Sequence, residues 1–187
     1  MPSSAIGQLS TIMGIIHVTR PQSVLDIGIG FGKYGFLCRE YLELWDGRNK
    51  YDDWQHRIDG IEAHSQYVTD LQRKIYSNMY VGDVRSVLPT LDAHYDLILM
   101  IDVIEHLSIE EGHRILSLCR EKANACLIAT PHVVTSQGDA FDNPFERHVS
   151  AWTQAEFERY PRRAFLPNQE SLICYLRFDD VNVVARV

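Results

Sequence analysis

Residues 24–35 read Val24-Leu25-Asp26-Ile27-Gly28-Ile29-Gly30-Phe31-Gly32-Lys33-Tyr34-Gly35, and this stretch decides the fold. It begins as a short apolar run without alternation, which is typical of a parallel strand covered on both faces. Glycines at every second position then allow a sharp turn and a close approach of the backbone to a ligand. A helix that begins after the turn points free N–H groups at that ligand. The stretch therefore predicts a strand, a turn and a helix that bind an adenosine-bearing cofactor.

The composition is that of one soluble globular domain. The chain has 187 residues, 45% of them hydrophobic and 23% charged, which suffices for one full core. No apolar run reaches the length of a membrane span, and the N-terminus lacks a signal-peptide pattern, so we expect no membrane partner and a cytoplasmic location. The cysteines show no metal-ligand or redox spacing, and we expect them to be buried and reduced. They are Cys38, Cys119, Cys126 and Cys174.

The net charge argues against nucleic acid as a partner. The formal charge is −7, whereas broad electrostatic capture of nucleic acid needs a basic face. One basic group lies in the last quarter of the chain, and we interpret it as solvated charge beside a helix and a strand. We therefore expect a small-molecule partner. The basic group consists of Arg147, Arg159, Arg162 and Arg163.

Helical and strand patterns alternate along the whole chain, which predicts an α/β fold with a mostly parallel, doubly wound sheet and helices on both faces. We expect one domain over residues 1–187, with an N-terminal helix or lid at 1–20, a surface insertion at 45–57 and a substrate-side loop at 131–152. Ser108 and Thr153 each begin a capping-box pattern. The tail at 181–187 is apolar enough for a further strand. Seven strands are expected, at 24–27, 58–61, 79–81, 95–101, 126–130, 164–167 and 171–178.

Two cofactors fit the glycine-rich turn at first sight. Residues 30–35 satisfy the G-x-G-x-x-G pattern of nicotinamide-cofactor sites. Such a site also needs an acid about 20 residues on to hold the ribose. Here the acid that ends the second strand is Glu62, thirty residues past Gly32. The nicotinamide reading also leaves the residues after the third and fourth strands unexplained.

Four motifs in order resemble those of the class I S-adenosylmethionine-dependent methyltransferases. They are residues 25–32 (LDIGIGFG), 60–63 (GIEA), 81–84 (VGDV) and 95–107 (YDLILMIDVIEHL). Each lies at the carboxyl end of an expected parallel strand, where doubly wound sheets bind ligands. The resemblance covers nearly the whole chain. It implies a Rossmann-like seven-stranded sheet whose last strand is antiparallel, with S-adenosylmethionine as the cofactor.

The chemistry of the motif residues suits that cofactor. Asp26 beside the glycines suits a cation and would repel a pyrophosphate. Glu62 can accept hydrogen bonds from both ribose hydroxyls. Asp83 can accept from the adenine amino group, while the backbone N–H of Val84 would face a ring nitrogen. The expected cofactor-binding residues are Asp26, Gly28, Gly30, Gly32, Glu62, Asp83, Val84 and Asp102.

A second group of residues is placed for chemistry on the acceptor. Asp102, Glu105 and His106 are spaced to share one face of a helical turn, and His148 lies in the substrate-side loop. If the acceptor is a hydroxyl, its proton must be removed, and we expect Glu105, His106 and His148 to be the catalytic residues. We expect Phe145 and Trp152 to wall the acceptor pocket.

The D-x-x-E-H pattern with the later H-V-S-A-W-T resembles a subset of this superfamily. The subset includes the small-RNA terminal 2′-O-methyltransferases and, more loosely, ubiquinone-pathway O-methyltransferases. In the RNA enzymes two acids and two histidines hold a divalent ion. Carried over, the metal ligands would be Asp102, Glu105, His106 and His148, although aspartate at the first position is shorter than glutamate. Such a mixed set suits Mn²⁺ better than Mg²⁺, and the alternative is a plain histidine base without metal.

The sequence thus predicts O-methylation of a small-molecule acceptor by a class I methyltransferase. One alternative is a terminal RNA 2′-O-methyltransferase with a metal site. Another, from a different class, is a non-catalytic cofactor-binding or scaffold subunit. The short N-terminal segment leaves the pocket either open or completed by a partner subunit in a homodimer.

Overall fold

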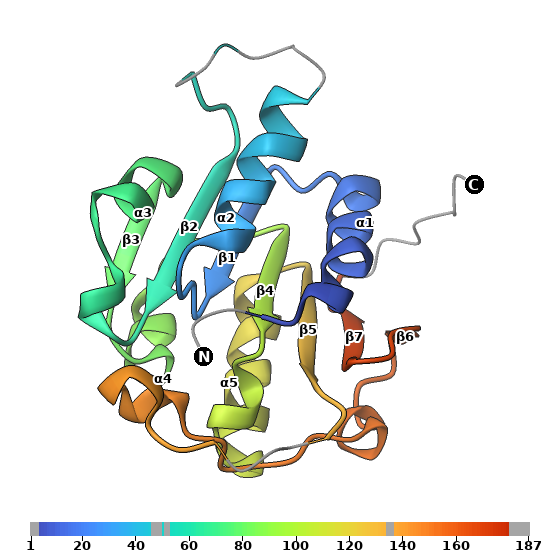
Figure 1. The fold of residues 1–187 in the computed structure, drawn as a ribbon. Helices are drawn as coiled ribbons and strands as arrows, with labels where there is room; N and C mark the ends of the chain where they lie inside the picture. The colour runs from blue at the N-terminus through green and yellow to red at the C-terminus, as the bar shows by residue number, and fades with distance from the viewer. Residues whose placement is uncertain (1–3, 46–49, 51–52, 134–136, 180–187) are drawn as a thin grey trace.

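A seven-stranded sheet forms the centre of the molecule (Figure 1). The computed structural model describes residues 4–45, 50, 53–133 and 137–179. The strand order is β3-β2-β1-β4-β5-β7-β6; β1 to β5 run parallel, and β7 is antiparallel to both β5 and β6. This confirms the predicted Rossmann-like fold, including its antiparallel last strand. The strands are β1 Ser23–Ile27, β2 Arg57–Glu62, β3 Asn78–Val81, β4 Leu97–Ile101, β5 Ala125–Pro131, β6 Arg163–Leu166 and β7 Ser171–Arg177.

Helices cover both faces of the sheet. One face packs against α1 (Leu9–Thr19), α2 (Lys33–Cys38) and α3 (Asp70–Ile75), and the other against α4 (Val84–Val87) and α5 (Ile109–Lys122). In Figure 1, α2 lies in front of the sheet and α5 behind it. Short turns complete the chain: η1 Ile6–Gln8, the π-helical η2 Arg39–Leu44, η3 Ser65–Tyr67, η4 Leu88–Thr90, η5 Ile104–His106, η6 Ala140–Asp142, η7 Pro144–Glu146 and η8 Gln154–Phe157.

The unbroken apolar run of β4 follows from this layering. Leu97 and Leu99 pack in the core beneath α1 and α2, while Ile98 and Met100 pack in the core beneath α5. Successive side chains of a strand point to opposite faces, so a strand covered on both faces has no polar side. Each fully buried side chain of this size contributes roughly 1.5–3 kcal/mol through the hydrophobic effect.

One of the two predicted capping boxes is confirmed. The Ser108 hydroxyl accepts from the backbone N–H of Glu111, whose carboxylate accepts from the N–H of Ser108, and α5 begins there. The prediction at Thr153 is wrong: the segment after it is the 3-10 turn η8, and Thr153 makes no side-chain cap bond. The box at Thr69, which begins α3, was not predicted.

Several smaller predictions can be compared with the described residues. All four cysteines are free and buried, as expected. The predicted tail at 181–187 and parts of the 1–20, 45–57 and 131–152 segments lie outside the described residues. No helix in the described part of the chain has the length and apolar character needed to cross a membrane.

The carboxyl ends of β1, β2, β3 and β4 meet at one edge of the sheet, because these strands are parallel. In Figure 1 this is the lower edge, and the orange segment that precedes β6 runs along it. The residues of the predicted motifs therefore come together at this edge.

Candidate active site

A pocket opens at this edge and collects residues from four strand ends and two loops. It encloses about 940 Å³ of space when its open mouth is included. Most of the predicted cofactor residues line it: Gly28, Gly30, Glu62, Asp83, Val84 and Asp102. The other lining residues used below are Ser4, Lys33, Tyr67, Arg85, His106, Asn143, Phe145 and Glu146.

The glycine-rich turn forms one wall of the pocket. Gly28 has φ +72°, and a Cβ there would lie 2.5 Å from Cγ2 of Val103. Only glycine avoids both the left-handed strain and this clash. The turn is held from β2, because the backbone N–H of Gly28 donates to the carbonyl of Ile61 and that of Gly30 donates to the Glu62 carboxylate.

Glu62 lies at the carboxyl end of β2 and is almost fully buried. Its Oε2 accepts from the N–H of Gly30 at 2.9 Å and its Oε1 from the N–H of His64 at 2.8 Å. Burial raises the pKa of Glu62 above its usual value, although the two backbone N–H groups oppose that shift. Each carboxylate oxygen has a second lone pair. Glu62 can therefore hold the turn and still accept two hydrogen bonds from a ligand.

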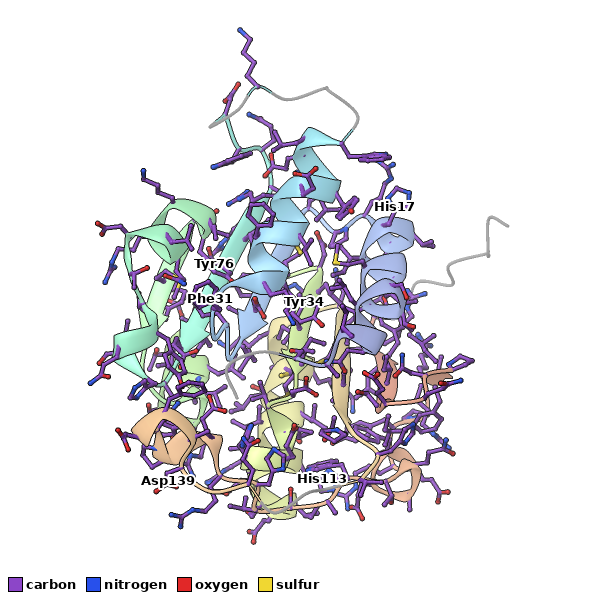
Figure 2. The ribbon with its side chains drawn as sticks, in the orientation of Figure 1. His17, Phe31, Tyr34, Tyr76, His113 and Asp139 are labelled. Carbon is purple, nitrogen blue, oxygen red and sulfur yellow. The ribbon has the colours of Figure 1, made fainter. Side chains whose placement is uncertain are left out.

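Asp26, predicted as a cofactor-binding residue, is not among the residues that line the pocket. Its carboxylate accepts from the Tyr76 hydroxyl at 2.6 Å, behind the turn, and Figure 2 shows Tyr76 next to this turn and Phe31. Gly35 permits the contact, since a Cβ there would lie 2.3 Å from the Tyr76 ring. Burial raises the pKa of Asp26 to about 7, against the lowering effect of the Tyr76 hydrogen bond. Gly32, also predicted at the site, lies outside the lining and precedes α2.

Asp83 and Val84 line the pocket after β3, but Asp83 already has a partner. Its two oxygens accept from the guanidinium of Arg85 at 2.5–3.0 Å, and Oδ1 also accepts from the Arg85 backbone N–H. Burial raises the pKa of Asp83, but these bonds outweigh it and the pKa is lowered. Arg85 also donates to Glu111 at 2.6 Å. The guanidinium is thus held rigidly at this end of the pocket.

Asp102 lies directly after β4 in the left-handed conformation, at φ +53°. Its Oδ2 accepts from the side chain of Gln8 at 2.6 Å. Burial raises the pKa of Asp102, with Gln8, Ser4 and Lys33 acting in the opposite direction. The Lys33 ammonium donates to the Ser4 carbonyl at 2.8 Å. The N-terminal segment therefore closes this end of the pocket around the carboxylate of Asp102 and the ammonium group of Lys33.

Three of the four predicted metal ligands come together beside the pocket. One potential ligand atom each from Glu105, His106 and His148 lies within 4.8 Å of the others. Asp102 is not in this group, and its carboxylate bonds to Gln8 instead. The imidazole rings of His106 and His148 have centroids 5.0 Å apart. The structure thus brings together three of the four residues that the resemblance implies as metal ligands.

Glu105 is buried beneath the two imidazoles. Its Oε2 accepts from the Thr130 hydroxyl at 3.1 Å, while Oε1 has no hydrogen-bond partner among the described residues. Burial, reinforced by the charge of Asp102, raises the pKa of Glu105 to about 8.

His106 has a defined tautomer. Its Nδ1 lies 3.1 Å from the carbonyl oxygen of Arg147. A carbonyl can only accept, so Nδ1 carries the proton and Nε2 has the lone pair. Burial lowers the pKa of His106, which favours this neutral form. His106 can therefore take a proton or bind a metal at Nε2.

Backbone contacts explain why the H-V-S-A-W-T segment lies beside the E-H pair. The N–H groups of Val149 and Ser150 donate to the carbonyl of Glu105 at 2.9 and 3.1 Å. The Ser150 hydroxyl donates to the carbonyl of Leu107. Trp152 was expected in the pocket wall, but it is 2% exposed and packs in the core against Phe157.

Residues 143–146 form a roof over the pocket; the sequence analysis placed them in the substrate-side loop but singled out only Phe145. Tyr67 donates to the Glu146 carboxylate at 3.3 Å, which links this roof to the β2–α3 connection. The Asn143 side chain caps η7 by accepting from the Phe145 N–H at 3.0 Å. The Asn143-Pro144 pair signals a turn at this point of the sequence. No local pattern, however, indicates that this turn covers the pocket.

The sheet order and the pocket at the carboxyl edge define a fold class, that of the class I S-adenosylmethionine-dependent methyltransferases. No protein-family model matches the sequence, and no curated protein matches it by sequence. Solved structures do match.

Three of the matching structures illustrate the likeness. A candidate O-methyltransferase from Nostoc punctiforme has TM-score 0.65 and 16% identity over 90% of this chain, which spans 55% of that protein. An S-adenosylmethionine-dependent methyltransferase from Archaeoglobus fulgidus has TM-score 0.63 and 16% identity, over 91% and 92% of the two chains. The N-terminal domain of EvdMO1, solved with SAH and D-fucose, has TM-score 0.60 and 14% identity, over 94% and 84%. At such identities the likeness establishes the fold.

Proposed function

We propose that this chain transfers the methyl group of S-adenosylmethionine to a hydroxyl of a small-molecule acceptor. One observation carries the proposal: a single pocket is lined by Gly28, Glu62, Val84 and His106, which come from four different strand ends. The first three are the groups that an adenosine needs, and the fourth is a candidate base. The fold class supports the same activity.

The pocket residues fit the cofactor. Gly28 presents only backbone to the pocket, and no side chain fits there because a Cβ would clash with Val103. Glu62 has two lone pairs left for the ribose hydroxyls, and the Val84 N–H would face the adenine ring. Because Arg85 occupies both oxygens of Asp83, the adenine amino group must share that carboxylate with the guanidinium. When bound, the cofactor supplies an activated methyl carbon.

The acceptor hydroxyl requires a base, and His106 is suited to that role. Its Nδ1–H bond to the Arg147 carbonyl fixes the ring and leaves the Nε2 lone pair available. His148 lies against the same ring. Glu105 has a ligand atom near both rings, and because its raised pKa leaves it mostly protonated at neutral pH, it would help to position the rings rather than supply a charge.

Metal assistance is the second candidate, and the Glu105, His106 and His148 group favours it. The unpartnered Oε1 of Glu105 and the Nε2 of His106 fit an ion such as Mn²⁺ or Mg²⁺. Such an ion would lower the pKa of an acceptor hydroxyl. A terminal RNA 2′-O-methyltransferase would use this variant, and the chain's net charge of −7 disfavours it.

A sugar-like acceptor fits the proposal best. EvdMO1, which shares the fold, was solved with D-fucose and SAH together. Neighbouring hydroxyls on a sugar could bond to the imidazoles and to the roof.

Calorimetric titration with S-adenosylmethionine and S-adenosylhomocysteine tests the cofactor half. We expect both ligands to bind. Glu62→Gln should weaken the binding of both at least tenfold, because it removes the negative charge and replaces one accepting carboxylate oxygen with an amide group. The matched control is Glu110→Gln, which makes the same substitution at an exposed residue of α5 outside the pocket and should leave the binding of both ligands unchanged. Absence of binding by the wild-type chain would refute the methyltransferase proposal and its RNA variant together.

A methyl-transfer assay over a panel of neutral sugars, phenols and RNA tests the acceptor half. His106→Ala should reduce turnover at least a hundredfold while cofactor binding persists. Chelator separates the two chemistries: unchanged turnover excludes the metal, and turnover restored by Mn²⁺ excludes the plain base. Cofactor binding without transfer to any member of the panel, including RNA, would favour the non-catalytic subunit.

A further inference from the structure

Glu146 is a buried acid in the roof of the pocket. The residue is 7% exposed and lines the pocket with its carboxylate bonded to the Tyr67 hydroxyl at 3.3 Å. Its charge acts on two other lining residues, raising the pKa of Glu62 and opposing the lowering of the pKa of His106. Glu146 therefore lies within electrostatic reach of both the β2 end and the η5 turn.

The covalent structure of the cofactor places its cation in the same region. The sulfonium sulfur is bonded to the ribose carbon and to the methyl group that is transferred. If Glu62 holds the ribose and His106 faces the acceptor, the sulfonium must lie between them. Glu146 lines this same pocket.

We propose that Glu146 makes the site select the cationic methyl donor over its neutral product. This inference rests on the proposed function and adds a role for a residue that the cofactor motifs do not include. In the transfer the carbon–sulfur bond breaks with its electron pair left on sulfur, the carbon–oxygen bond forms, and the acceptor proton passes to the base. The donor loses its positive charge, so the attraction to Glu146 ends when the product forms.

The permanent cations among the described lining residues have acidic partners of their own. Among the described lining residues, the permanent cations are Lys33 and Arg85. Arg85 is held by Asp83 and Glu111, and Lys33 interacts with Asp102 at the N-terminal end. Glu62 and Glu146 are the acids at the centre, and a partly buried site screens their charges less than open solvent does.

A purely structural role for Glu146 predicts a different result. If Glu146 only braced the roof through its hydrogen bond to Tyr67, loss of its charge would change the affinity for every adenosine ligand by the same factor. Glutamine retains an oxygen that can accept from Tyr67, so Glu146→Gln removes the charge and preserves the brace. Asp142→Asn is the matched control: it removes the same charge from an exposed residue of the same segment.

Calorimetric titration of the full chain with three ligands tests the proposal. The ligands are S-adenosylmethionine, S-adenosylhomocysteine, and sinefungin, which carries a protonated amine near the sulfonium position. We expect Glu146→Gln to weaken the two cationic ligands about tenfold, or about 1.4 kcal/mol, and the neutral one less than twofold. Asp142→Asn should leave all three unchanged.

The outcomes separate this inference from the function on which it rests. Equal weakening of all three ligands by Glu146→Gln, or no weakening of any, overturns the charge-selection role while the cofactor site stands. Failure of the wild-type chain to bind any of the three overturns both. Circular dichroism of each variant verifies that the fold is retained.

Discussion

The buried carboxyl of Asp26 should make the stability of the chain depend on pH. Burial raises its pKa from 3.8 to about 7. Between these values the folded chain holds a proton that the unfolded chain has released. The free energy of unfolding therefore falls as pH rises through this window, and the loss is complete above the folded pKa.

The size of the effect follows from the shift. The two pKa values differ by about 3 units, and each unit corresponds to 1.36 kcal/mol. Asp26 should thus cost about 4 kcal/mol of stability at pH 8 relative to pH 4. The local slope is close to 1.4 kcal/mol per pH unit. Asp26→Asn cannot ionise and lacks this slope, although it carries a constant penalty of about 1–3 kcal/mol because one oxygen must replace two acceptors.

Urea unfolding at half-unit intervals from pH 4 to pH 8 measures the effect. The difference in unfolding free energy between wild type and Asp26→Asn should narrow or reverse as pH rises, by about 4 kcal/mol in total. Tyr76→Phe removes the hydrogen bond that lowers the pKa of Asp26, so its slope should persist to higher pH. A wild-type–variant difference that stays constant across the range would refute the buried-carboxyl account.

Three further predictions concern packing, capping and the cysteines. Gly35→Ala should destabilise the chain by about 1–3 kcal/mol in thermal unfolding because the new Cβ meets the Tyr76 ring. Gly14→Ala on α1, where a Cβ meets nothing within 4 Å, should stabilise the chain by about 0.5–1 kcal/mol. A Gly35→Ala variant more stable than Gly14→Ala would contradict the packing described. Ser108→Ala should cost about 1 kcal/mol in urea unfolding, since α5 loses its capping box, whereas Thr153→Ala should cost little. The four buried thiols should react with a thiol reagent only after denaturation, and rapid reaction of the native chain would contradict their burial.

The strands could be predicted because their signal is local. The β4 run is apolar at every position because both of its faces are covered. The Ser108 box needs residues three apart, and it was predicted correctly. The Thr153 pattern has the same spacing, but the segment after it forms a single 3-10 turn. The capping-box pattern therefore predicted an α-helix that is not there.

Site residues divide in the same way. Glu62 is the last residue of β2 and His106 ends the turn η5 that follows β4, so the sheet edge brings both to the pocket. Asp26 precedes the end of β1, and its side chain points behind the turn toward Tyr76, fifty residues away. Asp83 was expected to be available, but its neighbour Arg85 folds back onto it. Partners of this kind are chosen by tertiary packing, which motif spacing does not contain.

The two halves of the pocket therefore have different origins. The donor half depends mainly on residues placed by strand ends, to which the inference above adds Glu146 of the roof. The roof formed by residues 143–146 depends on hydrogen bonds from outside the segment. Tyr67 donates to the Glu146 carboxylate, and the Gln137 side chain donates to the Glu146 carbonyl at 2.7 Å. Substitutions in the roof can thus reshape the acceptor side without moving Gly28 or Glu62. If the proposed function is right, acceptor identity is encoded mainly in the roof, the part of the site for which the sequence offers no local motif.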